Sequence, residues 1–441
     1  MTGPASPALG AERSVRLIRT LTLVAFLQWM GATAIVPMLP VYIRHLGGTV
    51  ALAGVVMASF FAAGVLSQYP IGRVADRVGR RPVLIGGLVT YGVASVSFLL
   101  PISAPAAIAL RSLQGVGAGA ATVASLALIS SSIAVERRGR AFASIYGGEL
   151  AGMAIGPLVG SVVGIRYMWV MFLASGLLAF AACAPALRIR DPHQRVVHPT
   201  GAAGGRTSAT LGRLRMNPSM VGAIIAGSAL GLTGGVYDIC WTLLLLARGA
   251  SGLEIGISWT LFAVPFVVVA KPSGWLADHM DRRTLVLAGI GSSALLCASY
   301  PFIHNVPLLI VLGASEALSF AAALPAMQSL LTQGSKPTEV GRVQGLFATF
   351  ETACTAVAAA AAGAAFAVAS WLPFVTVAAL VVIGLLVAAF IWRSVQGRVR
   401  RPDPTDAPGI PEGSGVSLPS TPDQPTPDQP PEPVGVSGDV Q

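Results

Sequence analysis

The stretch Gly72–Arg81 (GRVADRVGRR) decides the fold of this chain, because a related stretch returns about two hundred positions later. The second stretch is Gly274–Arg283 (GWLADHMDRR), and each of the two lies between long apolar runs. A short charged segment between apolar runs is typical of a tight turn at the edge of a membrane. The repetition therefore predicts a chain made of two related halves.

The two halves align along most of their length. In the first apolar run the offset is 200 (231 less 31), so that Gly31-Ala32-Thr33 matches Gly231-Leu232-Thr233. From the second run onward the offset is 202 (278 less 76). The pairs at this offset include Asp76 and Asp278, Arg80 and Arg282, Gly139-Arg140 and Gly341-Arg342, and Glu149 and Glu351. Parallel repeats of this kind occur in transporters that bind their substrate between the halves.

Composition places the chain in a membrane. Of its 441 residues 54% are hydrophobic and 11% are charged, whereas a soluble domain carries about 25% charged residues. The mean hydropathy is +0.71. A transmembrane helix needs about 20 apolar residues, and we expect twelve, at approximately 17–42, 51–71, 82–101, 105–131, 141–164, 168–187, 219–246, 252–272, 284–303, 307–332, 342–366 and 371–392. The predicted fold is an all-α membrane protein of two pseudo-symmetric six-helix bundles.

The positive charges indicate the orientation in the membrane. The net charge of +10 is compatible with a nucleic-acid partner, but the charges are not distributed for one. We assign 25 of the 29 Lys and Arg residues to one side of the membrane and three, Arg44, Arg166 and Arg248, to the other. An excess of Lys and Arg marks the cytoplasmic side. Both termini are therefore expected in the cytoplasm, and no nucleic-acid partner is expected.

Four regions follow from the apolar runs. Residues 1–187 form the first six-helix bundle, 188–216 a polar cytoplasmic linker, 217–395 the second bundle, and 396–441 a tail. The tail is rich in Pro, Asp and Gln and repeats a Thr-Pro-Asp-Gln-Pro unit at Thr421 and Thr426. Such a composition cannot bury a core, so the tail is expected to be disordered. A role for the tail in binding a partner stays open.

The stretch Gly72–Arg81 matches in full the pattern Gly-x-x-x-Asp-Arg-x-Gly-Arg-Arg, and it resembles the loop after the second helix of major facilitator superfamily transporters. We expect its glycines to permit a sharp reversal and Asp76 to accept hydrogen bonds from the start of a neighbouring helix. The resemblance implies a latch between the two bundles, whereas the alternative is a simple topology anchor. The candidate latch residues are Gly72, Asp76, Arg77, Gly79, Arg80 and Arg81, with Asp278 and Arg282 in the second copy.

A second motif lies in the fourth apolar run. Leu110–Gly119 (LRSLQGVGAG) resembles the superfamily pattern Arg-x-x-Gln-Gly-x-Gly. An arginine within a membrane helix is costly and rarely faces lipid, so Arg111 is expected to face a polar cavity or a carboxylate. The resemblance implies that Arg111 takes part in proton coupling. A structural ion pair within the first bundle is the alternative.

A third motif lies in the fifth run. Gly152-x-x-x-Gly156-Pro157-x-x-Gly160 resembles the antiporter signature of exporters in the superfamily, except that Ser161 stands where the signature has a second Gly. Glycines at this spacing share one helix face and allow close packing, and a proline interrupts the helical hydrogen bonding. The resemblance implies a helix that prevents leakage during transport. A generic packing face of small residues is the alternative.

Four acidic residues are candidates for proton coupling together with Arg111: Glu149, Glu351, Asp238 and Glu316. All four lie within predicted spans, where a carboxyl must be neutral, paired or hydrated. Glu149 and Glu351 are each nine residues inside an arginine, roughly 13 Å along a helix and near the midplane. A carboxyl held there can load and release a proton. For any one of the four, a purely structural role is the alternative.

The resemblance also indicates where substrate binds, because helices one, four, seven and ten line the central cavity of this fold. Asp238 and Glu316 lie on the seventh and tenth runs. The first run lacks the acid that drug exporters often carry there. Further candidates for lining the cavity are Gln28, Trp29, Gln114, Tyr237 and Trp241.

The resemblance covers nearly all of residues 15–395 and implies a proton-coupled exporter, similar to the twelve-span drug:proton antiporter branch. No phosphate-binding loop, catalytic constellation or metal spacing is evident in the sequence, so we expect neither an enzyme nor a cofactor or metal. The expected partners are a small molecule, protons and the lipid bilayer, and the expected protein is a monomer in a bacterial inner membrane. Two alternatives stay open, namely export of an endogenous metabolite, sugar or lipid-like molecule, and a scaffold or sensor that transports nothing.

Overall fold

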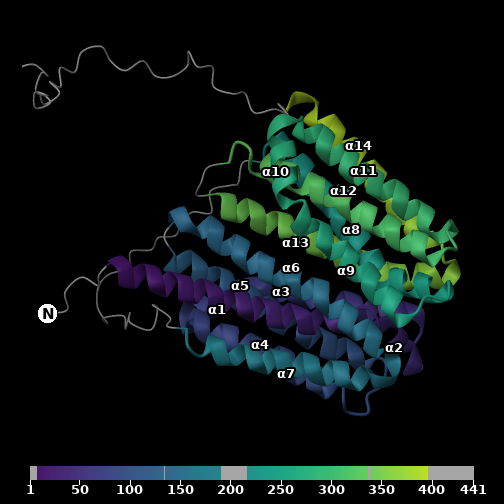
Figure 1. The fold of residues 1–441 in the computed structure, drawn as a ribbon, viewed down its shortest axis with the longest axis horizontal. Coiled ribbons are helices and arrows are strands. Elements are labelled where there is room, and N and C mark those ends of the chain that lie inside the picture. The colour runs from purple at the N-terminus through teal and green to yellow at the C-terminus, as the bar shows by residue number, and fades with distance from the viewer. Residues whose placement is uncertain (1–6, 134, 190–215, 336–338, 396–441) are drawn as a thin grey trace, which may run out of the picture. The chain divides into compact units, whose positions relative to one another are not determined.

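The computed structural model describes residues 7–133, 135–189, 216–335 and 339–395, and all regular secondary structure in these ranges is helical (Figure 1). The first half contains α1 (Pro7–Ala34), α2 (Leu39–His45), α3 (Val50–Val78), α4 (Arg80–Ser97), α5 (Ala106–Ser132), α6 (Val135–Val163), η1 (Ile165–Tyr167) and α7 (Met168–Ala186). The second half contains α8 (Pro218–Ala247), α9 (Gly252–Val268), α10 (Ala270–His279), α11 (Arg282–Ser299), η3 (Tyr300–Phe302), α12 (Val306–Thr332), α13 (Val340–Val368), α14 (Leu372–Ile391) and η4 (Trp392–Ser394). The predicted linker lies outside the described residues except at its ends, and the predicted tail lies wholly outside them.

The predicted membrane architecture is confirmed, with two changes of detail. Among the described residues, ten helices are long and apolar enough to cross a membrane, and the pair α9 and α10 makes eleven. The remaining predicted span is α4, whose 18 residues begin with two arginines that lower its hydropathy. The first and eighth predicted spans are each broken rather than continuous, between α1 and α2 and between α9 and α10.

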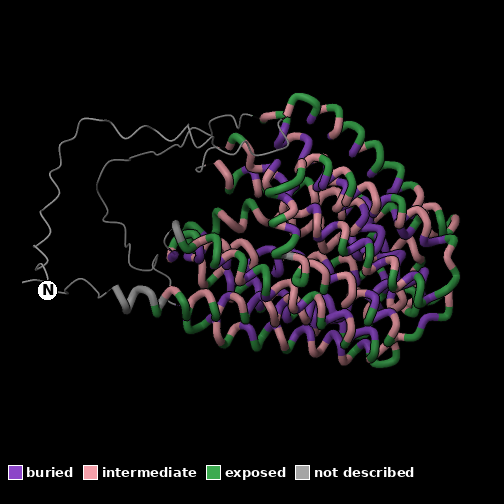
Figure 2. The backbone as a smooth tube through the Cα atoms, turned by 45° about the horizontal axis from the view of Figure 1, so that its top comes forward, coloured by how far each residue is buried: buried purple, intermediate pink, exposed green. Residues whose placement is uncertain are grey.

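Side-chain exposure agrees with a lipid surrounding. Buried residues recur along the sides of the helices that face one another (Figure 2). Large apolar side chains occupy exposed positions, among them Leu295, Leu386 and Phe390. A continuous apolar exterior is unfavourable in water and favourable in hydrocarbon, where helices satisfy their own backbone hydrogen bonds.

The first half depends on close contact between α1 and α6. A Cβ at Gly148 would lie 2.6 Å from the Thr22 carbonyl oxygen, and one at Gly152 would lie 2.7 Å from the Phe26 carbonyl oxygen. A Cβ at Gly160 would overlap the backbone of α1 at Ala34. Thr33 completes the contact by donating a hydrogen bond to the Gly152 carbonyl at 3.4 Å. The glycine face predicted from the fifth run is therefore a packing face against α1, as its spacing indicates.

The second half achieves the equivalent contact with the glycines on the other helix. A Cβ at Gly231 or Gly235 of α8 would overlap the α13 backbone at Glu351 and Thr355. At the α13 positions equivalent to Gly152, Gly156 and Gly160 the chain has Cys354, Ala358 and Ala362. Each half therefore brings two helices to backbone contact, with the glycines on α6 in the first half and on α8 in the second.

The two halves meet through two seams that the internal repeat relates to each other. In the first seam, α3 packs on α13, and a Cβ at Gly54 would lie 2.6 Å from the Ala359 carbonyl oxygen. In the second seam, α9 packs on α6, and a Cβ at Gly256 would lie 2.9 Å from the Cα atom of Leu158.

Gly54 and Gly256 are equivalent positions at the offset of 202, as are Gly363 and Ser161. A Cβ at Gly363 would overlap α3 at Val50, and one at Gly252 would overlap α6 at Ser161. We call this end of the bundles, which holds Val50, Gly252 and Gly363, the closed end.

The contact between α1 and α6 predicts opposite effects for two glycine substitutions in one helix. Gly160→Ala should lower the free energy of unfolding by about 1–3 kcal/mol, because its Cβ has no space beside Ala34. Gly147→Ala is the matched control, since nothing lies within 4 Å of its Cβ position and alanine favours the helix. Thermal unfolding of the purified protein in detergent measures both. Equal melting temperatures for the two variants would contradict the proposed role of the glycine face.

Candidate functional site

Glu149 lies at the middle of α6 and is half-buried. The side chain of Trp29, on α1, lies beside its carboxyl. Glu149 also lines a cavity of about 10 Å³ at the seam of α1, α5 and α6. A carboxyl at this depth is costly unless it is neutral, paired or hydrated. The cavity distinguishes Glu149 as an acid that has space for water beside it.

Glu351 is the counterpart of Glu149 in the second half and is half-buried in α13. Tyr146 lies within electrostatic range of both acids. It lies in α6 three residues before Glu149 and is 53% exposed. The structure thus brings two of the predicted proton sites, one from each half, to the same exposed tyrosine.

Glu316 has a different environment, since it is fully buried within α12. Its carboxyl oxygens accept hydrogen bonds from the hydroxyl of Tyr237 at 2.7 and 2.8 Å, from that of Tyr300 at 2.5 Å, and from that of Ser293. Buried polar groups of this kind are stabilised when every oxygen has a donor. Glu316 and Tyr237 thus lie together inside the second bundle, and their role at a substrate cavity stays a prediction.

Trp241 belongs to the same interior. Its ring packs against that of Tyr300 with centroids 5.1 Å apart, and its indole N–H donates to Ser258 at 3.0 Å. Trp241 is buried, and its role as a residue that lines the cavity stays a prediction.

Arg111 is buried in α5 and its direct contacts are with neutral groups. Its guanidinium donates to the Gln114 side chain at 2.8 Å and lies 4.5 Å from the centroid of the Phe60 ring. Gln114 in turn donates to Ser95 at 2.8 Å. Arg111 therefore has neutral groups and no carboxylate within ion-pair distance among the described residues. Gln114 binds Arg111 within the first bundle, and the predicted roles of both residues stay predictions.

Asp238 is the acid that interacts electrostatically with Arg111. It is half-buried in α8, in the opposite half. No ion pair forms between these two described residues within 4.0 Å. Gln28 is buried and donates to the Ala118 carbonyl at 3.5 Å.

The charged segment Gly72–Arg81 is not a loop. Residues 72–78 continue α3, and the chain reverses at Gly79 alone, whose φ of 104° lies in the region that favours glycine. The prediction that Gly72 also permits the reversal is wrong, because Gly72 is helical. Asp76 and Arg77 are exposed at the end of α3. The expected contact of Asp76 with the start of another helix is not among the hydrogen bonds of the described residues.

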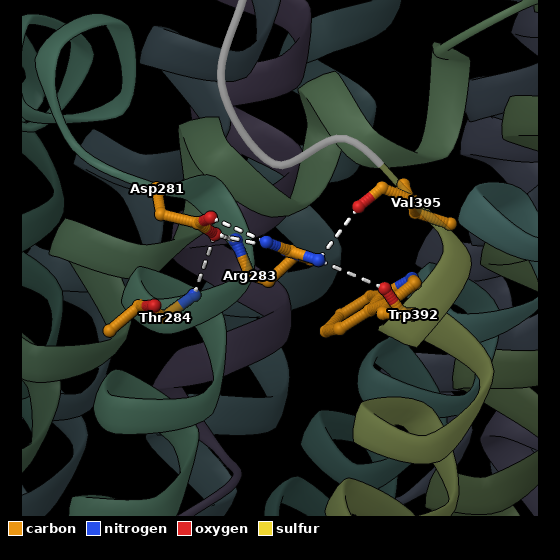
Figure 3. A network of polar contacts seen from close by, with 5 residues as sticks. All are labelled: Asp281, Arg283, Thr284, Trp392 and Val395. Atoms are coloured by element: carbon orange, nitrogen blue, oxygen red, sulfur yellow. Dashed lines mark hydrogen bonds and ion pairs between the residues drawn. The ribbon is translucent and has the colours of Figure 1, made fainter.

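The last arginine of each copy fastens its own bundle. Arg81 donates to the Leu187 carbonyl at the end of α7, at 2.6 Å. Arg283, its counterpart, donates to the Trp392 and Val395 carbonyls at the end of α14, at 3.0 and 2.7 Å (Figure 3). These arginines therefore clamp the last helix of each half, a role that is distinct from the predicted latch between the halves.

The second copy also contains a helix cap at Asp281, which stands where the first copy has Gly79. Asp281 accepts hydrogen bonds from the backbone N–H groups of Arg283 and Thr284 at 2.9 and 3.3 Å (Figure 3). Its carboxylate also forms an ion pair with the Arg283 side chain at 2.7 Å. Arg282 lies beside Asp278 at 3.7 Å, one helical turn away. In the second copy, the acceptor at a helix start is thus Asp281.

Sequence reasoning missed three groups around the acids: Tyr300 and Ser293 at Glu316, and Ser125 at the cavity beside Glu149. Asp281 carried a usable signal, since an Asp directly before an apolar helical run is a common N-cap. The others carried none, because they meet the acids across helices. The described residues contain no group of three or more His, Cys, Asp or Glu placed to hold a metal ion.

Two related six-helix halves that meet at one end and carry acids at mid-depth define a secondary transporter. A sequence profile described as Major Facilitator Superfamily matches residues 21–246 and 231–422. The chain belongs to the major facilitator superfamily.

Several resistance proteins are similar to this chain. The chloramphenicol resistance protein of Pseudomonas aeruginosa is 28% identical over 264 residues, which make up 59% of this chain and 62% of that protein. The class E tetracycline resistance protein of Escherichia coli is 25% identical over 360 residues, covering 78% of this chain and 85% of that protein.

Solved structures share the fold. A D-xylose-proton symporter has a TM-score of 0.69 at 16% identity, covering 87% of this chain and 98% of that one. A bacterial homolog of the human lysosomal transporter Spinster, in an inward-facing and occupied conformation, has a TM-score of 0.66 at 16% identity, covering 86% and 96%. As a member of the major facilitator superfamily with at least ten helices long and apolar enough to cross a membrane among its described residues, the chain is a multi-pass membrane transporter and not an enzyme.

The cap at Asp281 predicts a defined pH dependence of stability. The hydrogen bond from Arg283 holds the pKa of Asp281 below its ordinary value. Because the folded-state pKa is lowered, this stabilisation is present above the unfolded pKa of about 3.9 and is lost as pH falls through the folded value. Asp281→Asn keeps a capping residue but loses the ion pair, and should cost about 1 kcal/mol at pH 7, since water screens the partly exposed pair.

Thermal unfolding between pH 7 and pH 3 measures this dependence. The curves of wild type and Asp281→Asn should converge at the acidic end. Arg283→Gln is the companion variant, because it removes the partner and leaves the carboxylate. If Arg283→Gln kept the full acid-induced loss of the wild type, the ion pair would not be its cause.

Proposed function

We propose that this protein exports small amphipathic or drug-like molecules from the bacterial cytoplasm in exchange for protons, by alternating access. The observation that carries the proposal is the pair of half-buried acids at equivalent positions, Glu149 and Glu351, that share the exposed Tyr146. Transport coupled to protons requires a carboxyl that both gains and loses its proton within the membrane. The resistance phenotypes in the names of the relatives support export as the direction.

The arrangement of the bundles supports the inward-open state of such a cycle. The two seams of the closed end join the halves through backbone contacts at Gly54 and Gly256. At the opposite end, Asp76 and Arg77 are exposed. With both termini in the cytoplasm, the closed end faces outward and the charged segments face the cytoplasm. The latch of Gly72, Asp76, Arg77, Gly79 and Arg80 would then engage when the halves rock to the outward-open state.

The acids take different roles in this proposal. Glu149 is the first candidate for the coupling proton, followed by Glu351. Asp238 lies opposite Arg111 and is placed for attraction of a cationic substrate. Glu316 is a structural acid of the second bundle, because its oxygens are occupied by hydroxyl donors. The two bundles, 1–187 and 217–395, move as bodies about the linker 188–216.

Glu149→Gln tests the proposal in inside-out vesicles carrying the purified protein. An imposed proton gradient should drive uptake of lipophilic cationic dyes by wild type. The variant should lose roughly a hundredfold in rate, because the glutamine side chain cannot bind and release a proton as a carboxyl does. Glu254→Gln is the matched control, since Glu254 is an exposed capping-box residue at the start of α9 that glutamine can replace. Dye fluorescence and proton release are recorded together.

Each outcome assigns the proton or rejects the proposal. Uptake that survives Glu149→Gln would move the coupling proton to Glu351 or Asp238. Absence of uptake for every cationic compound would contradict drug export and favour an endogenous metabolite, sugar or lipid-like cargo. Saturable uptake without proton release would reject antiport and keep the transporter fold.

A further inference from the structure

The cavity beside Glu149 is lined by unusually polar side chains for the interior of a membrane bundle. Its lining comprises Ala25, Gln28, Ala121, Thr122, Ser125, Leu126, Ile145 and Glu149, from α1, α5 and α6. Its volume of about 10 Å³ suits one water molecule, and a buried water needs two to four polar partners. Gln28, Thr122, Ser125 and Glu149 supply four.

The hydroxyl groups of the cavity are not used by their own helix. In α5, Ser112, Ser130 and Ser131 each donate to the carbonyl four residues earlier, at 2.8, 2.8 and 3.0 Å. Serine in a membrane helix ordinarily satisfies its hydroxyl in this way. Ser125 and Thr122 form no such bond among the described contacts, although Ser125 is buried. Their hydroxyls are therefore available to a ligand in the cavity.

Gln28 completes the polar lining. It is 4% exposed, and its amide N–H donates to the Ala118 carbonyl at 3.5 Å. This bond leaves the side-chain oxygen as an acceptor. A water molecule offers two donors and two acceptors, which match the Gln28 oxygen, the two hydroxyls and the Glu149 carboxyl.

The glycine face of α6 fixes Glu149 at this place. Gly148 and Gly152 flank Glu149 and press against α1 at Thr22 and Phe26. Because the backbones are in contact on both sides of it, the Cα atom of Glu149 is held at the seam. The packing motif thus also sets the position of the acid.

The equivalent place in the second half is mostly filled by apolar side chains, although Gln328 stands at the position of Leu126 and accepts a hydrogen bond from Gln344 at 2.8 Å. At the offset of 202, Met327 replaces Ser125, Leu324 replaces Thr122, and Phe347 replaces Ile145. Met327 and Phe347 are buried. Ser228, which stands at the position of Gln28, donates to the Ile224 carbonyl of its own helix at 2.9 Å. The two equivalent acids therefore differ in their access to water.

We propose that the cavity at the α1–α5–α6 seam binds a single water molecule that relays the proton of Glu149, with Gln28, Thr122 and Ser125 as its positioning residues. The inference deepens the proposed antiport and rests on it. In loading, the water donates one proton to the Glu149 carboxylate and receives another from the hydrated opening, and discharge reverses both transfers. The cavity is not fully enclosed, and its open side is the proposed route between this water and the aqueous phase.

The groups facing Glu149 are few. From α1 they are Gln28 and Trp29, from α5 the two hydroxyls, from α6 Tyr146, and Glu351 of α13 acts through the same tyrosine. No described cation is in ion-pair contact with Glu149. The proposed relay therefore runs through the water and the hydroxyl groups of α5 rather than through an ion pair.

The test follows hydrogen–deuterium exchange of the protonated Glu149 carboxyl in full-length protein in lipid, through its infrared carbonyl stretch. Glu149→Gln assigns the band. Thr122→Leu/Ser125→Met gives the cavity the side chains of the second half, and should slow exchange by at least about tenfold because the water loses its place and its partners. Ser125→Thr keeps a hydroxyl and should exchange like wild type. Ser112→Ala is the control, since that hydroxyl bonds only within α5.

The outcomes separate the relay from the proposed function. Slowed exchange in the filled variant, with wild-type exchange in Ser112→Ala, supports the relay. Unchanged exchange in the filled variant, with size-exclusion chromatography showing an intact fold, overturns it. Dye transport that survives Glu149→Gln would reject Glu149 as the coupling acid, whereas the exchange rate reports on the water whether or not that acid drives transport.

Discussion

The structure of this molecule depends on helices whose backbones touch, with no side chains between them. Gly148, Gly152 and Gly160 allow it between α1 and α6, and Gly231 allows it between α8 and α13. In hydrocarbon no hydrophobic force drives helices together, so van der Waals contact of this kind carries the association. The position of Glu149, the seams of the closed end and the division into halves all depend on it.

Three glutamates within the membrane helices, Glu149, Glu351 and Glu316, have different surroundings in one fold. Glu149 borders a polar cavity, and Glu316 is enclosed by hydroxyl donors. Glu351 stands at the position equivalent to Glu149, where Met327 and Leu324 take the places of the two hydroxyl residues. Their differences arise from neighbouring helices rather than from their own. Duplication thus preserved the acids, while substitutions such as Met327 for Ser125 separated their chemistry.

Hydropathy and the repeat were sufficient to predict the helices and their division into halves, since both are local patterns along the chain. The glycine face was predicted for the same reason, because its spacing is that of one helix face. The prediction of a turn at Gly72 was wrong because a helix can continue through a glycine when the residues on both sides are helical. The donors to Glu316 could not be predicted, since Tyr237 and Tyr300 come from different helices and no spacing links them.

At Gly54 and Gly256 the seams of the closed end meet through uncharged atoms: Gly54 contacts the Ala359 backbone, and Gly256 contacts Leu158. Dissolved salt weakens attraction between charges and leaves contact between uncharged surfaces almost untouched. A bacterium does not control the salinity of the medium beyond its inner membrane. In the proposed orientation, this seal holds equally well in fresh and in salty surroundings, whereas the arginine-rich end faces a cytoplasm whose ion content the cell regulates.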